Sequence, residues 1–270
     1  MEIIDAHLHF MPGDRSFGET AAAAGEENTL GWLRAAFRRA GISHGVVMGN
    51  RGLGLAAHDY PPFLSYCVGL DREAMGPGLQ RALPLVEAHL QRPGCVGVKL
   101  YPGYNEADVT APAFAPVYAL AARYGKPVAI HTGATASPQA HLKYCHPLLL
   151  DTLAADHPRT LFVMCHYGNP FLADAAAVVG KNPNVCADLS GLLEGRVDVD
   201  RLFQNQGHYI AQLQGWIEYL GAYDKLMFGT DWPLADHAGY VEFIKRIIPE
   251  ARWEAVFAGN ARRVYGLANG

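Results

Sequence analysis

Short runs of apolar residues alternate along the chain with longer segments whose apolar positions recur every three or four residues. The short runs are rich in Val, Ile, Phe and Cys and predict β-strands, whereas the longer segments predict helices. The predicted helices repeatedly end in Gly or in a Lys-Pro, His-Pro or Asn-Pro step before the next strand. The eight predicted strands are residues 2–10, 44–49, 63–70, 95–101, 127–133, 160–168, 184–191 and 225–233.

The segment 29–41 illustrates the helical pattern. Leu30, Leu33 and Phe37 recur at helical spacing and predict one buried face, and Gly41 follows as a residue typical of the position after a helix end. Further helices are predicted over 78–91, 112–125, 146–158, 170–180 and 210–224, with one or two closing helices over 253–267.

Nearly continuous apolar strands that alternate with helices are typical of a parallel sheet covered by helices. Eight such units in 270 residues favour a single (β/α)₈ barrel domain that spans residues 1–270. A doubly wound open sheet is the alternative, but no GxGxxG or P-loop motif follows any predicted strand. The segment 50–62 is too short and too rich in Gly and Pro for a full helix, so we expect an irregular barrel between the second and third strands.

Composition narrows the function classes. Half of the residues are apolar and 18% are charged, which indicates a large core, and the formal charge of −4 comes without a basic run. We therefore expect no nucleic-acid partner. No apolar stretch is long enough to span a membrane, and the first strand follows Met1 directly, which leaves no room for a signal peptide. The five cysteines form no CxxC pair, and buried thiols fit a cytoplasmic location; they are Cys67, Cys95, Cys145, Cys165 and Cys186.

The first predicted strand carries the stretch DAHLHF, in which Asp5, His7 and His9 alternate. In a regular strand these three side chains share one face. Two imidazoles on one side of a buried strand suit a divalent metal ion, although a pair of hydrogen-bonded core histidines gives the same pattern. The metal interpretation requires further ligands from later strands.

Polar residues at the ends of other predicted strands can supply these ligands. The carboxyl ends of parallel strands meet at one mouth of a barrel, where catalytic groups gather. Several buried polar groups at this place would each need a partner, which favours a metal or catalytic site over isolated core residues. The residues that end the strands are His7 and His9, Lys99 and Tyr101, His131, His166 and Tyr167, Asp188, and Asp231.

The stretches DAHLHF, VAIHTG, FVMCHYG and MFGTDWP, in this order, resemble the amidohydrolase superfamily and are most similar to its amidohydrolase-2 branch. The closing stretch GNARRVYGL resembles the end of that branch as well. The resemblance implies a (β/α)₈ metal enzyme. The branch includes hydrolases, lactonases and non-oxidative decarboxylases. It makes His7, His9, His131 and Asp231 the metal ligands, a donor set that suits one Zn²⁺.

The resemblance also implies the catalytic roles. Asp231 would accept a proton from water, and His166 would orient this water or polarise a substrate oxygen. In a binuclear site, a carboxylated Lys99 would bridge two metals and His166 would bind the second. We favour the mononuclear site, with Lys99 as an ammonium that binds a substrate carboxylate. Asp5 either supports His7 or is a satisfied core acid.

Four further residues are candidates for substrate contact by their position alone. Tyr101 ends the fourth strand, and Arg51 follows the second strand, where it would suit a carboxylate. Trp232 follows Asp231 and would contact a flat ring, and His237 lies in the segment after the eighth strand.

The sequence therefore predicts a zinc-dependent hydrolase of a small, carboxylate-bearing molecule. A decarboxylase of an aromatic or unsaturated acid that uses the same metal site is the alternative, and a non-catalytic metal-binding barrel is a third possibility. A homo-oligomer is compatible with the apolar segment 51–63.

Overall fold

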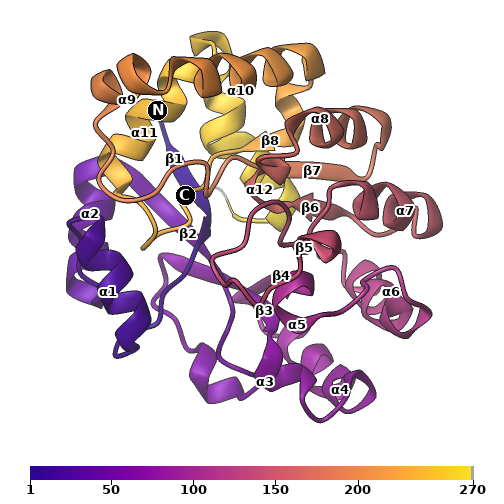
Figure 1. Cartoon of the computed structure of the whole chain (residues 1–270). Helices are drawn as coiled ribbons and strands as arrows, with labels where there is room; N and C mark the ends of the chain where they lie inside the picture. The colour runs from indigo at the N-terminus through magenta and orange to yellow at the C-terminus, as the bar shows by residue number, and fades with distance from the viewer. Residues whose placement is uncertain (269–270) are drawn as a thin grey trace.

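Eight parallel strands form the centre of the molecule in a computed structural model that describes residues 1–268. The strands are hydrogen-bonded in chain order from β1 to β8, and Figure 1 shows them surrounded by helices. Their bounds are β1 Ile3–Leu8, β2 Ile42–Met48, β3 Leu64–Leu70, β4 Cys95–Leu100, β5 Val128–Ile130, β6 Phe162–Met164, β7 Val185–Asp188 and β8 Leu226–Met227.

Backbone hydrogen bonds between β1 and the segment after β8 bring the two edges of the sheet together. The Ala6 amide donates to Phe228 O at 2.9 Å and the Asp231 amide donates to His7 O at 2.8 Å. A parallel bridge between Leu8 and Trp232 continues this contact. The predicted (β/α)₈ barrel is confirmed.

Helices cover the outside of the strands. The helix α2 begins after Thr29, whose side chain accepts a hydrogen bond from the Trp32 amide, and ends at Gly41 with a left-handed φ of 72°. The helices are α1 Arg15–Ala23, α2 Leu30–Ala40, α3 Arg72–Met75, α4 Leu79–Leu90, α5 Pro102–Asn105, α6 Ala115–Arg123, α7 Leu148–Asp156, α8 Leu172–Lys181, α9 Val199–Asn205, α10 Gly207–Leu220, α11 His237–Ile247 and α12 Asn260–Tyr265.

The connection between β2 and β3 departs from the regular pattern, as predicted. It contains one short 3₁₀ turn, η1 Leu55–His58, in place of a full helix. Five helices lie in segments for which the sequence pattern predicts no helix, namely α1, α3, α5, α9 and α11. None of the helices in the described part of the chain is long and apolar enough to cross a membrane.

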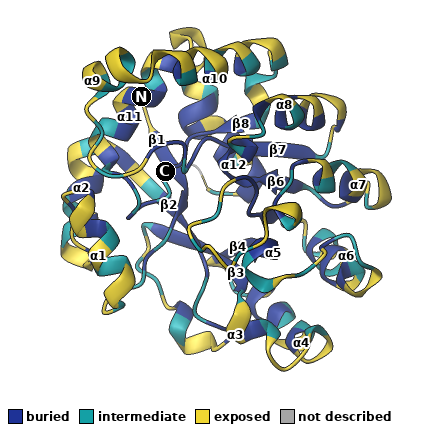
Figure 2. Cartoon of the chain, in the orientation of Figure 1, coloured by how far each residue is buried: buried dark blue, intermediate teal, exposed yellow. Residues whose placement is uncertain are grey.

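Two apolar clusters hold the barrel together. One lies between the strands and the outer helices. The other fills the barrel interior with residues from all eight strands, such as Ile4, Val46 and Met227, and is closed by Ala261 and Val264 of α12. Figure 2 shows the strands as almost entirely buried. The burial of both faces explains why the strands read as continuous apolar runs.

Candidate metal centre and active-site cavity

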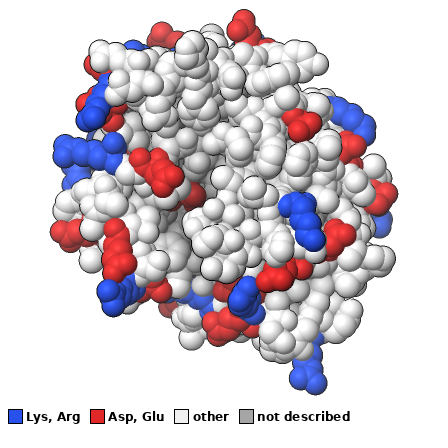
Figure 3. Space-filling model, in the orientation of Figure 1, with Lys and Arg blue, Asp and Glu red and all other residues white. Residues whose placement is uncertain are grey.

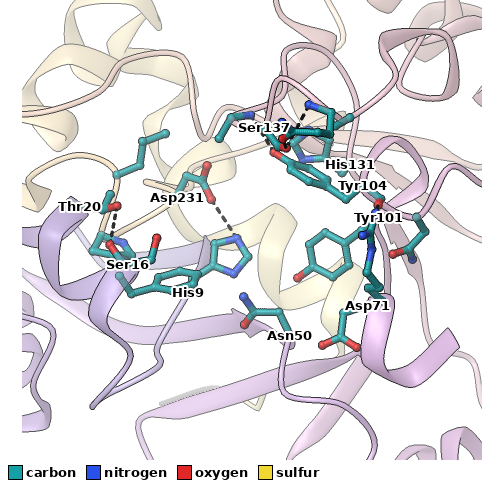
Figure 4. Close-up of a pocket in the computed structure, with 18 of the residues that line it drawn as sticks. His9, Ser16, Thr20, Asn50, Asp71, Tyr101, Tyr104, His131, Ser137 and Asp231 are labelled. Carbon is teal, nitrogen blue, oxygen red and sulfur yellow. Dashed lines mark hydrogen bonds and ion pairs between the residues drawn. The ribbon is translucent and has the colours of Figure 1, made fainter. Parts of the chain in front are cut away.

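His7, His9 and Asp231 form a compact group at the carboxyl ends of β1 and β8. The Nε2 atoms of His7 and His9 each lie 3.3 Å from Asp231 Oδ1. One ligand atom from each residue lies within 4.8 Å of the others. Figure 4 shows His9 and Asp231 facing each other at one side of a cavity.

Two atoms of this group fit a bound cation. His7 Nε2 and Asp231 Oδ1 are buried and have no hydrogen-bond partner. Buried polar atoms without partners are rare because desolvation is costly, and atoms that converge on one point are compensated when a cation lies between them. Two imidazole nitrogens and a carboxylate oxygen are a donor set that suits zinc.

The second ring nitrogen of each histidine is held in place. His7 Nδ1 lies 2.9 Å from Asp188 Oδ2, and His9 Nδ1 lies 3.1 Å from Met48 O. Since both partners are acceptors, each Nδ1 carries the proton and each Nε2 presents its lone pair to Asp231 Oδ1. Metal-binding histidines are commonly oriented in this way.

Asp188, at the end of β7, connects several elements of the site. Its Oδ1 accepts hydrogen bonds from the His166 amide at 2.9 Å and from the Ser190 amide and hydroxyl at 3.2 and 2.5 Å. Burial would raise the pKa of Asp188, but the imidazoles of His7 and His166 hold it below its usual range. In the sequence, the signal for Asp188 is an acid at the end of an apolar strand, and this signal alone assigns it no role.

His131 and His166 form a second pair beside this group. His166 Nε2 lies 3.1 Å from His131 Nδ1, and His131 Nε2 donates to Ala134 O at 2.9 Å. His166 Nδ1 lies 2.9 Å from Ser190 Oγ and 3.9 Å from Asp231 Oδ2. Burial lowers the pKa of both imidazoles. The structure places this predicted ligand next to His166 and outside the three-residue group.

Left-handed backbone conformations aim Asp231 and His166 at the site. Their φ angles are 59° and 62°, values that are uncommon for residues other than glycine and that concentrate at functional sites. Burial would raise the pKa of Asp231, but the imidazoles of His166, His9 and His7 hold it well below its usual range.

Asp5 supports the turn that precedes Asp231. Its Oδ1 accepts from the Thr230 amide at 3.0 Å and its Oδ2 accepts from the Thr230 hydroxyl at 2.6 Å. The expectation that Asp5 shares a face with His7 is wrong. A register shift between Asp5 and Leu8 breaks the alternation of β1, and the Asp5 carboxylate lies 3.7 Å from His237 of the outer helix α11.

A cavity of about 880 Å³ opens beside the three-residue group. His9, Tyr101, His131, His166 and Asp231 are among the residues that line it. Figure 3 shows a hollow in this face of the molecule, with Asp and Glu side chains at its edge. Its size suits a small molecule.

Comparison with known proteins decides the family. The family model described as Amidohydrolase, of the amidohydrolase-2 type, matches residues 4–267. The chain belongs to the amidohydrolase-2 family. This confirms the resemblance that was inferred from the sequence motifs. Members of this family are hydrolases or decarboxylases, and they typically bind a divalent metal.

Solved structures share the fold of this amidohydrolase. A zinc-bound amidohydrolase from Burkholderia multivorans has a TM-score of 0.69 and 20% identity, with 99% of this chain and 100% of that chain covered. A 2,6-dihydroxybenzoate decarboxylase has a TM-score of 0.71 and 16% identity over 98% and 99% of the two chains. A probable 2-pyrone-4,6-dicarboxylic acid hydrolase from Acinetobacter baumannii has a TM-score of 0.65 and 18% identity, with 99% of this chain and 100% of that chain covered. No curated protein matches the chain in sequence.

The structure of the amidohydrolase corrects the predicted surroundings of two cations. Lys99 is fully buried, and its ammonium lies 2.8 Å from Cys165 Sγ, so it does not line the cavity. Arg51 turns away from the cavity and donates to Phe10 O at 2.8 Å. Lys99 ends the fourth predicted strand and Arg51 follows the second, but strand position does not determine the direction of a long side chain.

Trp232 and His237 also lie away from the cavity. Trp232 is fully buried, and its indole donates to Glu26 at 3.3 Å. His237 is the first residue of α11 and stacks on Trp232 with a centroid distance of 5.8 Å. The expectation that they line the mouth is wrong, because both pack into the layer between the barrel and its outer helices.

Proposed function

We propose that this amidohydrolase is a metal-dependent hydrolase of a small molecule, with zinc held by His7, His9 and Asp231. The observation that carries the proposal is the convergence of two buried atoms without partners, His7 Nε2 and Asp231 Oδ1, beside an 880 Å³ cavity. The zinc-bound amidohydrolase with the same fold supports the choice of metal. A bound divalent ion supplies Lewis acidity and lowers the pKa of water toward neutrality.

The protein's own groups provide the proton transfers. Asp231 Oδ2 is the carboxylate oxygen that does not lie between the two imidazoles, and it lies 3.9 Å from His166 Nδ1. In this position Asp231 accepts the proton of the attacking water, and His166 orients the water and the substrate oxygen. The hydroxyl of Ser190, which donates to Asp188, lies 2.9 Å from His166 Nδ1 and holds the His166 ring, and His131 lies beside it. The buried position of these groups keeps the hydrogen-bond geometry fixed before the reaction begins.

Decarboxylation is the second candidate function. The 2,6-dihydroxybenzoate decarboxylase covers the full barrel of this chain, and His166 and Asp231 are both placed to deliver a proton to a carbon atom. Incubation of the zinc-loaded enzyme with lactones and with aromatic carboxylates separates the two reactions. Release of acid from lactones supports hydrolysis, and release of CO₂ from aromatic acids supports decarboxylation.

Metal content tests the site itself. Elemental mass spectrometry of protein purified without added metal should find about one zinc per chain. His7→Ala and Asp231→Ala should lose it, whereas a variant of the exposed His208, His208→Ala, should retain it. About two metals per chain would favour the binuclear site with a carboxylated Lys99. No metal after zinc is supplied would contradict the proposal, and tight binding without any turnover would favour a non-catalytic barrel.

A further inference from the structure

The sequence predicts a substrate with a carboxylate, whereas acidic side chains outnumber Lys and Arg among the described residues that line the cavity. We propose that the substrate is a small acyl compound that is uncharged away from its reacting group and that donates hydrogen bonds from hydroxyl groups to the side of the cavity formed by Asp71 and Asn105. This proposal rests on the hydrolase function proposed above and specifies its substrate class.

Lys99 and Arg51, the two cations predicted to bind a substrate carboxylate, do not line the cavity. The Lys99 side chain is fully buried against Cys165. Arg51 donates to Phe10 O at 2.8 Å and to Ala57 O at 3.5 Å. Arg51 would have to break these hydrogen bonds before its guanidinium reached the cavity.

Arg72 is the one Lys or Arg among the described residues that line the cavity. Its guanidinium donates to Tyr104 O at 3.1 Å and lies 3.8 Å from the Glu106 carboxylate. The side chain is 77% exposed, so solvent screens its charge and its attraction for an anion is weak.

Two carboxylates flank Arg72 along the wall, those of Asp71 and Glu73. Asp71 is fixed at the N-terminus of α3: its Oδ1 accepts from the Ala74 amide at 2.8 Å and its Oδ2 accepts from the Gly52 amide at 3.0 Å. Figure 4 shows Asp71 across the cavity from His9 and Asp231. Because both oxygens are held, this carboxylate is unable to turn away from an approaching anion.

The same wall offers hydrogen-bond acceptors. Asn105 donates through Nδ2 to Leu70 O at 2.7 Å, which leaves its buried Oδ1 without a partner. The Asp71 carboxylate has lone pairs beyond its two backbone donors. Acceptors without donors are satisfied by a ligand that donates, and a hydroxyl group donates without bringing negative charge.

A matched set of lactones tests the proposal. The set consists of dihydrofuran-2-ones that carry hydroxymethyl, carboxylate or dimethylaminomethyl at the same ring carbon, and hydrolysis by the zinc-loaded enzyme is followed by proton release. We expect kcat/KM for the hydroxymethyl lactone to exceed that for the carboxylate by about tenfold or more, because like charges in a cleft are strongly disfavoured. Equal or faster hydrolysis of the carboxylate would overturn the proposal. A strong preference for the cationic lactone would also overturn it in favour of an ammonium substrate.

Asp71→Asn tests whether the wall causes this preference. The single oxygen of Asn can still accept from the Ala74 amide and cap α3, while the Gly52 amide loses its acceptor and the negative charge is removed. The variant should raise the carboxylate-to-hydroxymethyl ratio of kcat/KM by roughly threefold to tenfold. Asp198→Asn is the matched control, because Asp198 caps α9 in the same way and does not line the cavity. An unchanged carboxylate-to-hydroxymethyl ratio of kcat/KM in Asp71→Asn would show that the Asp71 charge does not cause the preference.

Binding of ligands that do not react separates this inference from the hydrolase proposal. Cyclopentanones with the same hydroxymethyl and carboxylate substituents have the shape of the lactones and resist hydrolysis, and calorimetry gives their affinities for the zinc-loaded enzyme. Tighter binding of the hydroxymethyl ketone supports the inference even if no lactone is hydrolysed, a result that would contradict the hydrolase function alone. Tighter binding of the carboxylate would contradict the inference even if lactones are hydrolysed.

Discussion

Replacing Asp188 by asparagine should switch the proton of His7 from one ring nitrogen to the other. In the native protein Asp188 Oδ1 accepts three hydrogen bonds, from the His166 amide and from the amide and hydroxyl of Ser190. Its Oδ2 accepts from His7 Nδ1 at 2.9 Å. An asparagine keeps the three donors satisfied only if its oxygen takes the place of Oδ1, and its NH₂ group then points at His7 Nδ1.

A donor opposite Nδ1 reverses the tautomer of His7. Nδ1 must then accept, the proton moves to Nε2, and Nε2 loses the lone pair with which it faces Asp231 Oδ1. We expect the affinity for zinc to fall by at least about 10- to 100-fold, the range found when an orienting partner is removed. This corresponds to about 1.4–2.7 kcal/mol of binding free energy. The opposite amide orientation would leave three donors facing an NH₂ group and cost about 1–3 kcal/mol of folding stability.

Competition with a chromogenic chelator measures the zinc affinity of Asp188→Asn, and long-range ¹⁵N–¹H spectra of the histidine rings report which nitrogen of His7 carries the proton. Asp198→Asn serves as the control, since it makes the same chemical change at an exposed helix cap. Zinc affinity of Asp188→Asn within roughly twofold of the native value would refute the tautomer argument.

Three further predictions concern the glycine beside the site, acid stability and metal removal. Gly191→Ala should lower kcat/KM about tenfold or more, because the φ of Gly191 is 60° and a Cβ would lie 2.6 Å from His166 Nδ1. Gly25→Ala is the control, since Gly25 has a φ of 72° and open space around a Cβ, and it should retain activity. Equal losses of kcat/KM in the two variants would contradict the steric argument. Burial lowers the pKa of His89 from 6.5 to about 4, so the unfolded chain binds the proton first and up to about 3 kcal/mol of stability is lost as the pH falls from 6.5 to 4. Urea titrations should show that the free energy of unfolding falls less between pH 6.5 and 4 in His89→Gln than in the control His208→Gln. Equal pH dependence of the unfolding free energy in the two variants would refute the role given to His89. Removal of the metal with a chelator should lower Tm in a calorimetric scan, and added zinc should restore it; an unchanged Tm would argue against a metal bound to the folded state.

The sequence determined the barrel and the set of residues at its mouth. The apolar runs and helical periodicity are local properties, and eight alternating strand and helix units without a GxGxxG or P-loop motif favour the barrel over a doubly wound sheet. His7, His9 and Asp231 follow from the same logic, because residues at the carboxyl ends of parallel strands gather at one mouth. The helix α11 follows the eighth predicted strand, in a segment whose local pattern predicts no helix.

Only the tertiary structure decided which of these side chains meet. A shift in the register of β1 turned Asp5 toward α11, and the choice of Asp188 as the partner of His7 depends on strands that are 181 residues apart in the sequence. Lys99 and Arg51 point away from the cavity because nearby acceptors from other elements bind them. Side-chain direction is set by contacts between distant segments, and no pattern within one segment encodes those contacts.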